Sequence, residues 1–298
     1  METPNYYDQL EIDINQLFET KLDVEVKKYP TYLKKLFNRY LFAFLIKSNL
    51  INPLTESGFI SGWYKEFRSY WSCILEGRPL YLHDFYFLLG VYRQRFQNVE
   101  TPELADKKSF LESWQNQDTM YQLFGAVRRF SREPLHCKGF EKWINNGDTI
   151  LEYGCGIAPI SYSFLKFSIR RNLNITIADI RQINFHYAIH RLGKNINHFE
   201  ITPYKNSIER EKYNVILMIT VMEHLPDPLN TVKNITSGLK SNGIFVFDYI
   251  LGDGDGQDTM EAVEQRGAVL EYIDDQYDIL SGAIIKNDSM GTTVCRLK

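Results

Sequence analysis

The stretch Thr149-Ile-Leu-Glu152-Tyr-Gly154-Cys-Gly156-Ile-Ala-Pro159 joins a short apolar run, a glycine turn and a proline. The apolar run predicts a buried strand that ends at a carboxylate. Two glycines let the backbone turn sharply and approach a ligand closely. Proline favours the first turn of a helix, where its missing N–H is not needed. The order of strand, glycine turn and helix predicts a nucleoside-binding turn at the carboxyl end of a parallel strand.

The residues around this stretch alternate between strand-like and helix-like patterns. Apolar runs of strand length occupy 149–153, 175–179, 198–201, 214–219 and 243–250. Helical spacing of apolar residues occupies 160–171, 185–193 and 228–239. This alternation predicts a parallel sheet that is covered by helices on both faces. Two further runs, 277–285 and 292–297, predict an antiparallel pair at the sheet edge.

The first 140 residues follow a different pattern. Apolar residues recur every three or four positions, which predicts helices over 33–45, 59–74 and 83–97 and another from 101 toward 130. Of the 42 aromatic residues in the chain, 28 precede residue 145. They either form an ordinary helical core or also line a substrate pocket. We therefore expect a helical cap or substrate domain at 1–140 and a catalytic domain at 141–298.

Composition restricts the class of protein. The chain has 298 residues and a net charge of −3, without the basic stripe of a nucleic-acid binder. Its four cysteines lack metal-binding spacing, so we expect no metal site. The N-terminus does not resemble a signal peptide, and the apolar runs are too short to cross a bilayer. We expect a cytoplasmic enzyme that has neither a nucleic-acid nor a membrane partner.

Acidic residues around the glycine turn indicate the kind of nucleoside. A dinucleotide-binding turn would carry a third glycine where this chain has Pro159. Glu152 would repel a pyrophosphate and favours a ligand with a cationic end. Asp179 closes the next predicted strand, 23 residues after Gly156, where an acid can bind both ribose hydroxyls. Each acid also has a plainer interpretation, Glu152 as a surface carboxylate and Asp179 as a turn residue.

These motifs resemble the class I S-adenosylmethionine-dependent methyltransferase family over about residues 141 to 298. Glu152-Tyr-Gly154-Cys-Gly156 is similar to the first family motif, E/D-x-G-x-G, and Asp179 to the acid that closes the second strand. The stretch from Tyr213 to Pro228, with Glu223-His224-Leu-Pro, is similar to the fourth-strand motif. The resemblance implies an α/β fold: a Rossmann-like, doubly wound seven-stranded sheet, mostly parallel with an antiparallel last strand. The N-terminal domain beside it is expected to be all-α.

The resemblance also implies a cofactor, S-adenosylmethionine, and the residues that bind it. The methionine end would lie near Glu152, the ribose hydroxyls would bond Asp179, and backbone near 218–220 would complete the cradle. The expected cofactor-binding residues are Glu152, Tyr153, Gly154, Cys155, Gly156, Asp179, Ile180, Tyr204, Ile219 and Thr220. The family often carries an acid after the third strand, near the adenine. This chain has Tyr204 and Asn206 there, so we expect the adenine contact from one of them.

Methyl transfer requires an acceptor atom held about 3 Å from the methyl carbon and in line with the breaking bond. A base assists when the acceptor is a hydroxyl or an acidic carbon. His224 is our first candidate for a catalytic base, and Tyr249, at the end of the fifth strand, is the second. His224 has a plainer interpretation, because Pro226 and Pro228 indicate that a helix starts there. Cys155 has no neighbouring base and is interpreted as a small buried filler.

The sequence leaves the reaction and the acceptor open. Methyl transfer to N, O or C of a small molecule, such as a secondary metabolite, is the leading hypothesis. The alternatives are aminocarboxypropyl transfer or cyclisation, as in nicotianamine-synthase-like enzymes, and a catalytically silent cofactor-binding partner. The acidic loop 253–258 is either a lid or a calcium loop, although the calcium pattern needs glycine where Asp258 stands. The aromatic-rich N-terminal helices could supply a homodimer interface.

Overall fold

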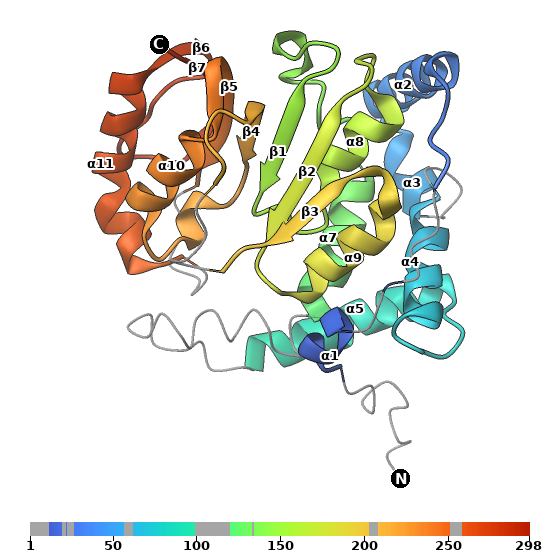
Figure 1. Cartoon of the computed structure of the whole chain (residues 1–298). Helices are drawn as coiled ribbons and strands as arrows, with labels where there is room; N and C mark the ends of the chain where they lie inside the picture. Colours follow the sequence, from blue (N-terminus) through green and yellow to red (C-terminus); the bar gives the residue numbers. More distant parts are fainter. Residues whose placement is uncertain are drawn as a thin grey trace.

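The computed structural model describes residues 12–19, 22, 27–56, 62–98, 120–132, 134–202, 208–250 and 258–298. Within these residues the chain forms a seven-stranded sheet with strand order β3-β2-β1-β4-β5-β7-β6 (Figure 1). The strands are β1 Thr149–Tyr153, β2 Asn174–Asp179, β3 Asn197–Glu200, β4 Tyr213–Met218, β5 Leu239–Tyr249, β6 Tyr277–Ser281 and β7 Met290–Leu297. Each lies within a few residues of a predicted strand.

The strand pairing confirms the predicted fold class. β1 is parallel to both β2 and β4, β3 is parallel to β2, and β5 is parallel to β4. β7 runs antiparallel to both β5 and β6. The strand order reverses between β1 and β4, and open α/β sheets bind their ligands at the carboxyl ends of the strands beside such a reversal. The glycine turn follows β1 and therefore lies at this point.

Four helices cover the two faces of the sheet. α8 (Pro159–Phe167) and α9 (Ile183–Leu192) pack on one face, against apolar residues such as Ile150 and Val215. α10 (Pro228–Thr236) and α11 (Met260–Gln276) pack on the other, against Leu151 and Phe245 among others. The apolar runs of β1 and β4 thus have both faces buried, as expected for a parallel sheet.

The helix α11 was missing from the sequence analysis. It begins at a capping residue, Thr259, whose side chain accepts a hydrogen bond from the Ala262 N–H at 3.1 Å. Its buried residues are Ala262, Arg266, Val269, Leu270 and Ile273. A threonine cap followed by apolar residues at helical spacing is a recognisable start signal, so the helix was predictable from sequence.

The N-terminal half is helical, as predicted. Its helices are α1 Ile14–Glu19, α2 Tyr32–Lys47, α3 Ile51–Glu56, α4 Trp63–Cys73, α5 Leu82–Asn98 and α7 Met120–Arg132. Their aromatic core, which includes Phe67 and Phe124, also contains Ile157, Ile183 and Tyr187 from the α/β half. In Figure 1, α5 and α7 lie beneath the ends toward which the parallel strands point. The domain boundary at residue 140 stays a prediction, because this core contains residues from both sides of it.

None of the helices in the described ranges is both long enough and apolar enough to cross a membrane.

Candidate cofactor and active site

The turn after β1 has a left-handed backbone conformation, which glycine adopts more readily than other residues. Gly154 has φ +66°, and a Cβ at this position would lie 2.5 Å from Cγ2 of Val221. Gly156 has φ +51°, and a Cβ there would meet no atom within 4 Å. Gly154 therefore allows the turn after β1 to pack against the residues after β4. Gly156 faces open space, which leaves room for a ligand against its backbone.

Asp179 ties the end of β2 to this turn. Its Oδ2 accepts a hydrogen bond from the Gly156 N–H at 2.6 Å. Its Oδ1 accepts from the Ile180 N–H at 2.7 Å and from Gln182 Nε2 at 2.8 Å. Burial raises the pKa of Asp179 to about 6, against the opposite effect of these three donors. A carboxylate has about four acceptor positions, and three of those of Asp179 are occupied. Two ribose hydroxyls would therefore use the free position and displace one of the present donors.

Glu152 is directed to the start of α8. Its Oε2 accepts from the Ser161 N–H at 2.7 Å and its Oε1 from the Ile160 N–H at 3.4 Å. The side chain thus supplies acceptors to helix N–H groups that have no partner within the helix. Burial raises the pKa of Glu152 to about 7. The expected contact between Glu152 and the methionine end of the cofactor stays a prediction.

A second acid, Asp248, holds the turn after β4. Thr220 has φ +58°, and its N–H donates to Asp248 Oδ1 at 2.6 Å. Burial raises the pKa of Asp248 to about 6, and the positive charge of Arg129 on α7 acts in the opposite direction. The helical half therefore brings a cation to the carboxyl edge of the sheet. Arg129 was not among the predicted site residues, although the sequence clusters it with Arg128 and Arg132.

Glu223 and His224 lie in the short 3-10 helix η4, Met222–His224. Glu223 is only 3% exposed, and its Oε2 has no hydrogen-bond partner among the described residues. Burial raises the pKa of Glu223 to about 8, and the negative charges of Asp248 and Asp258 add to the rise. The His224 ring lies between two acids: Nε2 is 3.9 Å from Glu223 Oε1, and Nδ1 is 3.9 Å from Asp258 Oδ1. Its side chain is 23% exposed, so a small molecule can reach it.

Tyr249 is placed differently from His224. Its ring is 1% exposed, and its hydroxyl donates to the Ala262 carbonyl of α11. The Arg266 guanidinium lies 4.5 Å from the centre of the ring. The hydroxyl thus serves the packing of α11, and we do not carry Tyr249 forward as a catalytic residue.

The remaining predicted residues surround the glycine turn or lie outside the described part. Tyr153 and Cys155 are buried, and the Cys155 N–H donates to the Ala178 carbonyl at 3.1 Å. Ile219 packs against the core beneath α8 and α9. Tyr204, Asn206 and the acidic positions 253–257 lie outside the described residues. Within the described ranges, no group of three or more His, Cys, Asp or Glu side chains is arranged to hold a metal ion.

A family model described as "Methyltransferase domain" matches residues 114–280, more than half of the chain. The chain belongs to this methyltransferase family. S-adenosylmethionine is its cofactor, as the resemblance implied, and the match does not favour the aminocarboxypropyl or the silent-partner alternative. The match begins 27 residues before position 141, so the family resemblance includes the whole of α7.

Curated relatives of this methyltransferase include the ubiquinone biosynthesis O-methyltransferases of Histophilus somni and Pseudomonas fluorescens. The first is 24% identical over 162 residues, which cover 52% of this chain and 65% of the relative. The second is 23% identical over 158 residues, which cover 51% of this chain and 64% of the relative. The chain therefore spans slightly less than two thirds of the length of these relatives.

Solved structures with similarity to this methyltransferase include two at low sequence identity. A SAM-dependent methyltransferase from Aquifex aeolicus is 14% identical, with a TM-score of 0.42, covering 65% of this chain and 100% of that chain. The 1,6-didemethyltoxoflavin-N1-methyltransferase of Burkholderia thailandensis, crystallised with S-adenosylhomocysteine, is 15% identical, with a TM-score of 0.41. That alignment covers 64% of this chain and 86% of that chain.

The residues at the glycine turn fit the cofactor. Gly156 presents a backbone with open space beside it, and Asp179 stands at the end of the next strand. Buried acids surround the edge, at positions 152, 179, 223 and 248, and each has a raised pKa. A cationic ligand would favour the ionised form of these acids. S-adenosylmethionine carries such a charge on its sulfonium.

Proposed function

We propose that this methyltransferase transfers the methyl group of S-adenosylmethionine to a hydroxyl oxygen of a small molecule at the carboxyl edge of the sheet. The observation that carries the proposal is the position of His224, partly exposed between Glu223 and Asp258. The names of the curated relatives, which are O-methyltransferases, support the choice of oxygen over nitrogen or carbon. A small acceptor agrees with the mildly acidic net charge of −3, which does not favour a nucleic-acid substrate.

When bound, the cofactor supplies an activated methyl group, so the chain has to bind, orient and deprotonate the acceptor. Asp179 would hold the ribose, and the backbone at Gly154 and Gly156 would lie against the cofactor. The His224 imidazole would take the proton of the acceptor hydroxyl, and the two neighbouring acids would stabilise the resulting imidazolium. The helices α5 and α7 would restrict the access of water to the edge.

The cofactor part of the proposal is tested by calorimetric titration with S-adenosylhomocysteine. We expect the wild-type chain to bind and Asp179→Ala to weaken binding by about 10- to 100-fold, since two charge-assisted hydrogen bonds are lost at about 1.5–3 kcal/mol each and partly regained from water. A matched control is Glu200→Ala, which removes the acid at the end of β3 that pairs with Arg181 at 3.0 Å. Absence of any wild-type binding would contradict the assignment of the site.

The catalytic part is tested with His224→Gln, which keeps a polar side chain but removes the base. General-base catalysis contributes typically about 10²- to 10⁴-fold, so we expect kcat to fall by at least about 100-fold. The affinity for S-adenosylhomocysteine should remain within a few-fold of the wild type. The assay follows S-adenosylhomocysteine release with a panel of small phenols, catechols and amines. An unchanged kcat, or turnover with amines alone, would refute the role of His224 toward a hydroxyl.

A further inference from the structure

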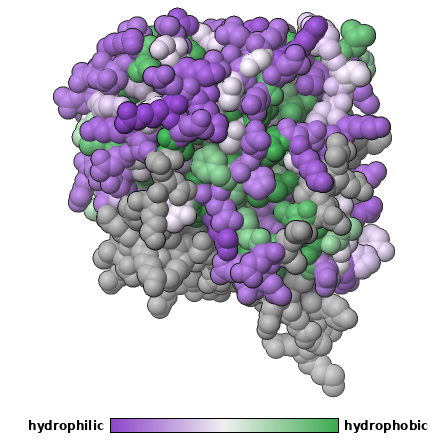
Figure 2. All heavy atoms as spheres, viewed as in Figure 1, coloured by the Kyte–Doolittle hydropathy of each residue, from purple (hydrophilic) through white to green (hydrophobic). Residues whose placement is uncertain are grey.

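Helix α2 presents four large apolar side chains to solvent. Leu33, Phe37, Tyr40 and Phe44 lie at positions i, i+4, i+7 and i+11, so they share one face of the helix. Their exposed fractions are 78%, 66%, 72% and 62%. These four residues are termed the α2 outer face. In Figure 2, apolar residues reach the surface at the upper right, where Figure 1 places α2.

The opposite side of α2 carries charges that face the protein. The Lys35 ammonium donates to the Phe164 carbonyl at 3.5 Å. Arg39 pairs with the buried Glu141 and donates to the Phe167 carbonyl at 3.5 Å. A surface helix ordinarily turns its apolar stripe to the core and its charged side to water. α2 already buries Phe42 and Leu45 on its inner side, so the α2 outer face is a second apolar stripe, and it lacks the cover that such a stripe normally has.

The charged residues of α2 itself are all basic. Residues 27–55 contain six lysines and arginines and no acid, although the whole chain has a net charge of −3. Lys34 and Lys47 are exposed and flank the α2 outer face on the helix. A surface that combines apolar side chains with flanking cations complements an apolar layer bordered by negative charge.

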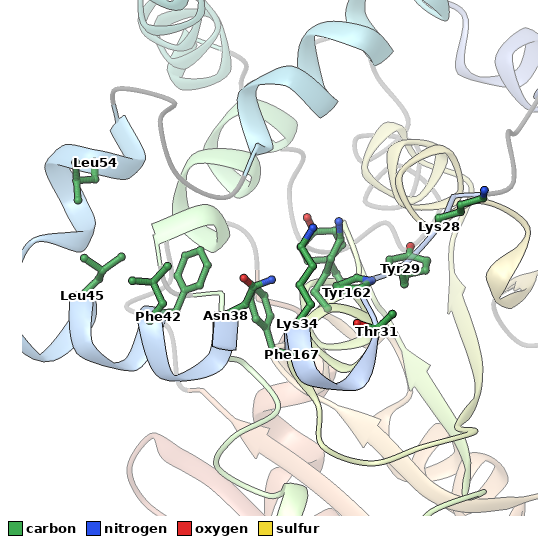
Figure 3. Close-up of a pocket in the computed structure, with 13 residues that line it drawn as sticks. Lys28, Tyr29, Thr31, Lys34, Asn38, Phe42, Leu45, Leu54, Tyr162 and Phe167 are labelled. Atoms are coloured by element: carbon green, nitrogen blue, oxygen red, sulfur yellow. The ribbon is translucent and has the colours of Figure 1, made fainter. Parts of the chain in front are cut away.

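A groove beside α2 is also lined by both apolar and cationic side chains. It has a volume of about 740 Å³ and lies between α2, α3 and α8 (Figure 3). One end is lined by Phe42, Leu45 and Leu54, and the other by Lys28 and Lys34. Lys166 also lines it, while lying 3.8 Å from Glu66. The groove thus offers an apolar end and a cationic end to one elongated molecule, which is the chemistry of a lipid with an anionic head.

We propose that α2 docks this protein on the surface of a membrane that contains anionic lipids. The helix has 16 residues, so at about 1.5 Å per residue it is about 24 Å long. It would lie in the plane of the interface with the α2 outer face in the acyl boundary and Lys34 and Lys47 among the headgroups. Such docking needs no spanning segment, so it is compatible with the finding that no described helix crosses a bilayer.

A second copy of the chain fits the α2 outer face less well. Two such faces would bring exposed lysines of like charge together without an acid between residues 27 and 55 to pair with them. Each aromatic side chain has about 150–250 Å² of surface, so the three aromatics of the face expose roughly 300–500 Å². A stable interface buries about 800 Å² on each partner. The expected homodimer through the N-terminal helices would therefore need further surface.

Vesicle sedimentation tests the proposal with the full chain. We expect the wild-type protein to sediment with vesicles that contain 30% phosphatidylglycerol in phosphatidylcholine, and weakly with phosphatidylcholine alone. Phe37→Ser with Phe44→Ser should weaken binding by at least about tenfold. Lys34→Glu with Lys47→Glu should weaken it by about fivefold or more per lysine, because each cation near an anionic surface contributes about 1 kcal/mol. Raising the salt to 0.5 M should weaken binding by wild type.

Matched variants elsewhere serve as controls. Phe87→Ser removes a phenylalanine of α5 that is 54% exposed, and Lys233→Glu with Lys286→Glu reverses two exposed lysines of the α/β half. These variants should bind vesicles as wild type does. Every variant should keep the wild-type circular dichroism and S-adenosylhomocysteine affinity, which separates this test from that of the active site. Lack of vesicle binding, binding that the α2 variants do not change, or a dimer that Phe37→Ser with Phe44→Ser turns into a monomer would overturn the proposal.

Discussion

The buried acids at the carboxyl edge of the sheet differ in their hydrogen-bond donors on the two sides of that edge. After β1 and β2, Asp179 accepts three hydrogen bonds and Glu152 accepts two from the start of α8. After β4, the Oε2 atom of Glu223 has no hydrogen-bond partner in the part of the chain that the structure describes, and burial raises the pKa of Glu223 to about 8. Both sides give backbone donors to their buried carboxyl groups, but among the four acids of the described part at positions 152, 179, 223 and 248 only Glu223, after β4, keeps a buried oxygen without a donor.

From this difference we infer that the two sides of the edge have different roles in the site. Donors fix the position of a carboxylate, so the side with Asp179 holds one geometry for the glycine turn. A buried carboxyl oxygen without a donor makes the charged form of the acid more costly, so the protonation of Glu223 should respond to a nearby cation. We therefore interpret the side of β1 and β2 as the rigid part of the cofactor site. On the side of β4 and β5, we expect Glu223, which has the highest pKa of the four acids, to change its charge most when a cationic ligand binds.

The largest expected effect comes from Gly154, where the two sides meet. Gly154→Ala would strain a left-handed backbone, at about 1–2 kcal/mol, and force its Cβ onto Val221, at about 1–3 kcal/mol. We expect a loss of about 2–5 kcal/mol in the free energy of unfolding and no measurable binding of S-adenosylhomocysteine. Urea denaturation and calorimetric titration provide the two measurements.

Gly147→Ala is the matched control for this change. Gly147 has φ +81°, but a Cβ there would meet nothing within 4 Å. It should lose no more than about 1–2 kcal/mol and keep cofactor binding. If the two variants were equally stable and bound equally well, the contact between Gly154 and Val221 would not join the two sides as we describe.

Replacing one carboxylate on each side by its amide tests the difference in donors between the two sides. In Asp179→Asn, the amide group must turn a donor toward at least one of three N–H donors. In Glu223→Gln, the buried Oε2 loses no donor. Because an unsatisfied buried group costs about 1–3 kcal/mol, Glu223→Gln should be the more stable of the two variants by about that amount near pH 7. Thermal unfolding from pH 5 to pH 9 measures both, and a reversed order would contradict the assigned contacts.

The raised pKa of Glu223 predicts the direction in which stability changes with pH. Its folded pKa, about 8, lies above its ordinary value of 4.5. The stability that it contributes is therefore fully present below pH 4.5 and is lost as the pH rises through 8. Glutamine has no such loss, so the melting temperature of Glu223→Gln relative to wild type should rise between pH 5 and pH 9. If this difference in melting temperature did not change with pH, the surroundings of Glu223 would not raise its pKa.

Local pattern was enough to predict the fold and much of the glycine site. The seven strands follow from apolar runs, and the position of Asp179 follows from the spacing between two strand ends. Pro159 occupies the first turn of α8, as its fixed φ suggested. Periodicity and turn chemistry are properties of neighbouring residues, so a sequence displays them directly.

The partners of the site residues depend on distant packing and were not predictable in the same way. Glu152 is at the strand end as expected, but its side chain reaches α8. The hydroxyl of Tyr249 reaches α11, a helix that the sequence analysis missed. Arg129 influences Asp248 only because α7 folds over the edge of the sheet. These side-chain partners depend on how elements far apart in the sequence pack together.

The smallest expected effect concerns one strained residue on each side of the edge. Ala158, before α8, has φ +51° and is fully buried, whereas Thr220, after β4, has φ +58° and an exposed side chain. Glycine would relieve about 1–2 kcal/mol of strain at either position, but it adds about 0.4–1 kcal/mol of unfolded-state entropy. Ala158→Gly also gives up a buried methyl, about 0.8 kcal/mol. We expect Ala158→Gly to be neutral within about 1 kcal/mol and Thr220→Gly to stabilise by up to about 1.5 kcal/mol by urea denaturation. Because strain tends to persist where function requires it, Thr220→Gly should also weaken S-adenosylhomocysteine binding, and a variant that is more stable with unchanged binding would show that the Thr220 backbone is not part of the cradle.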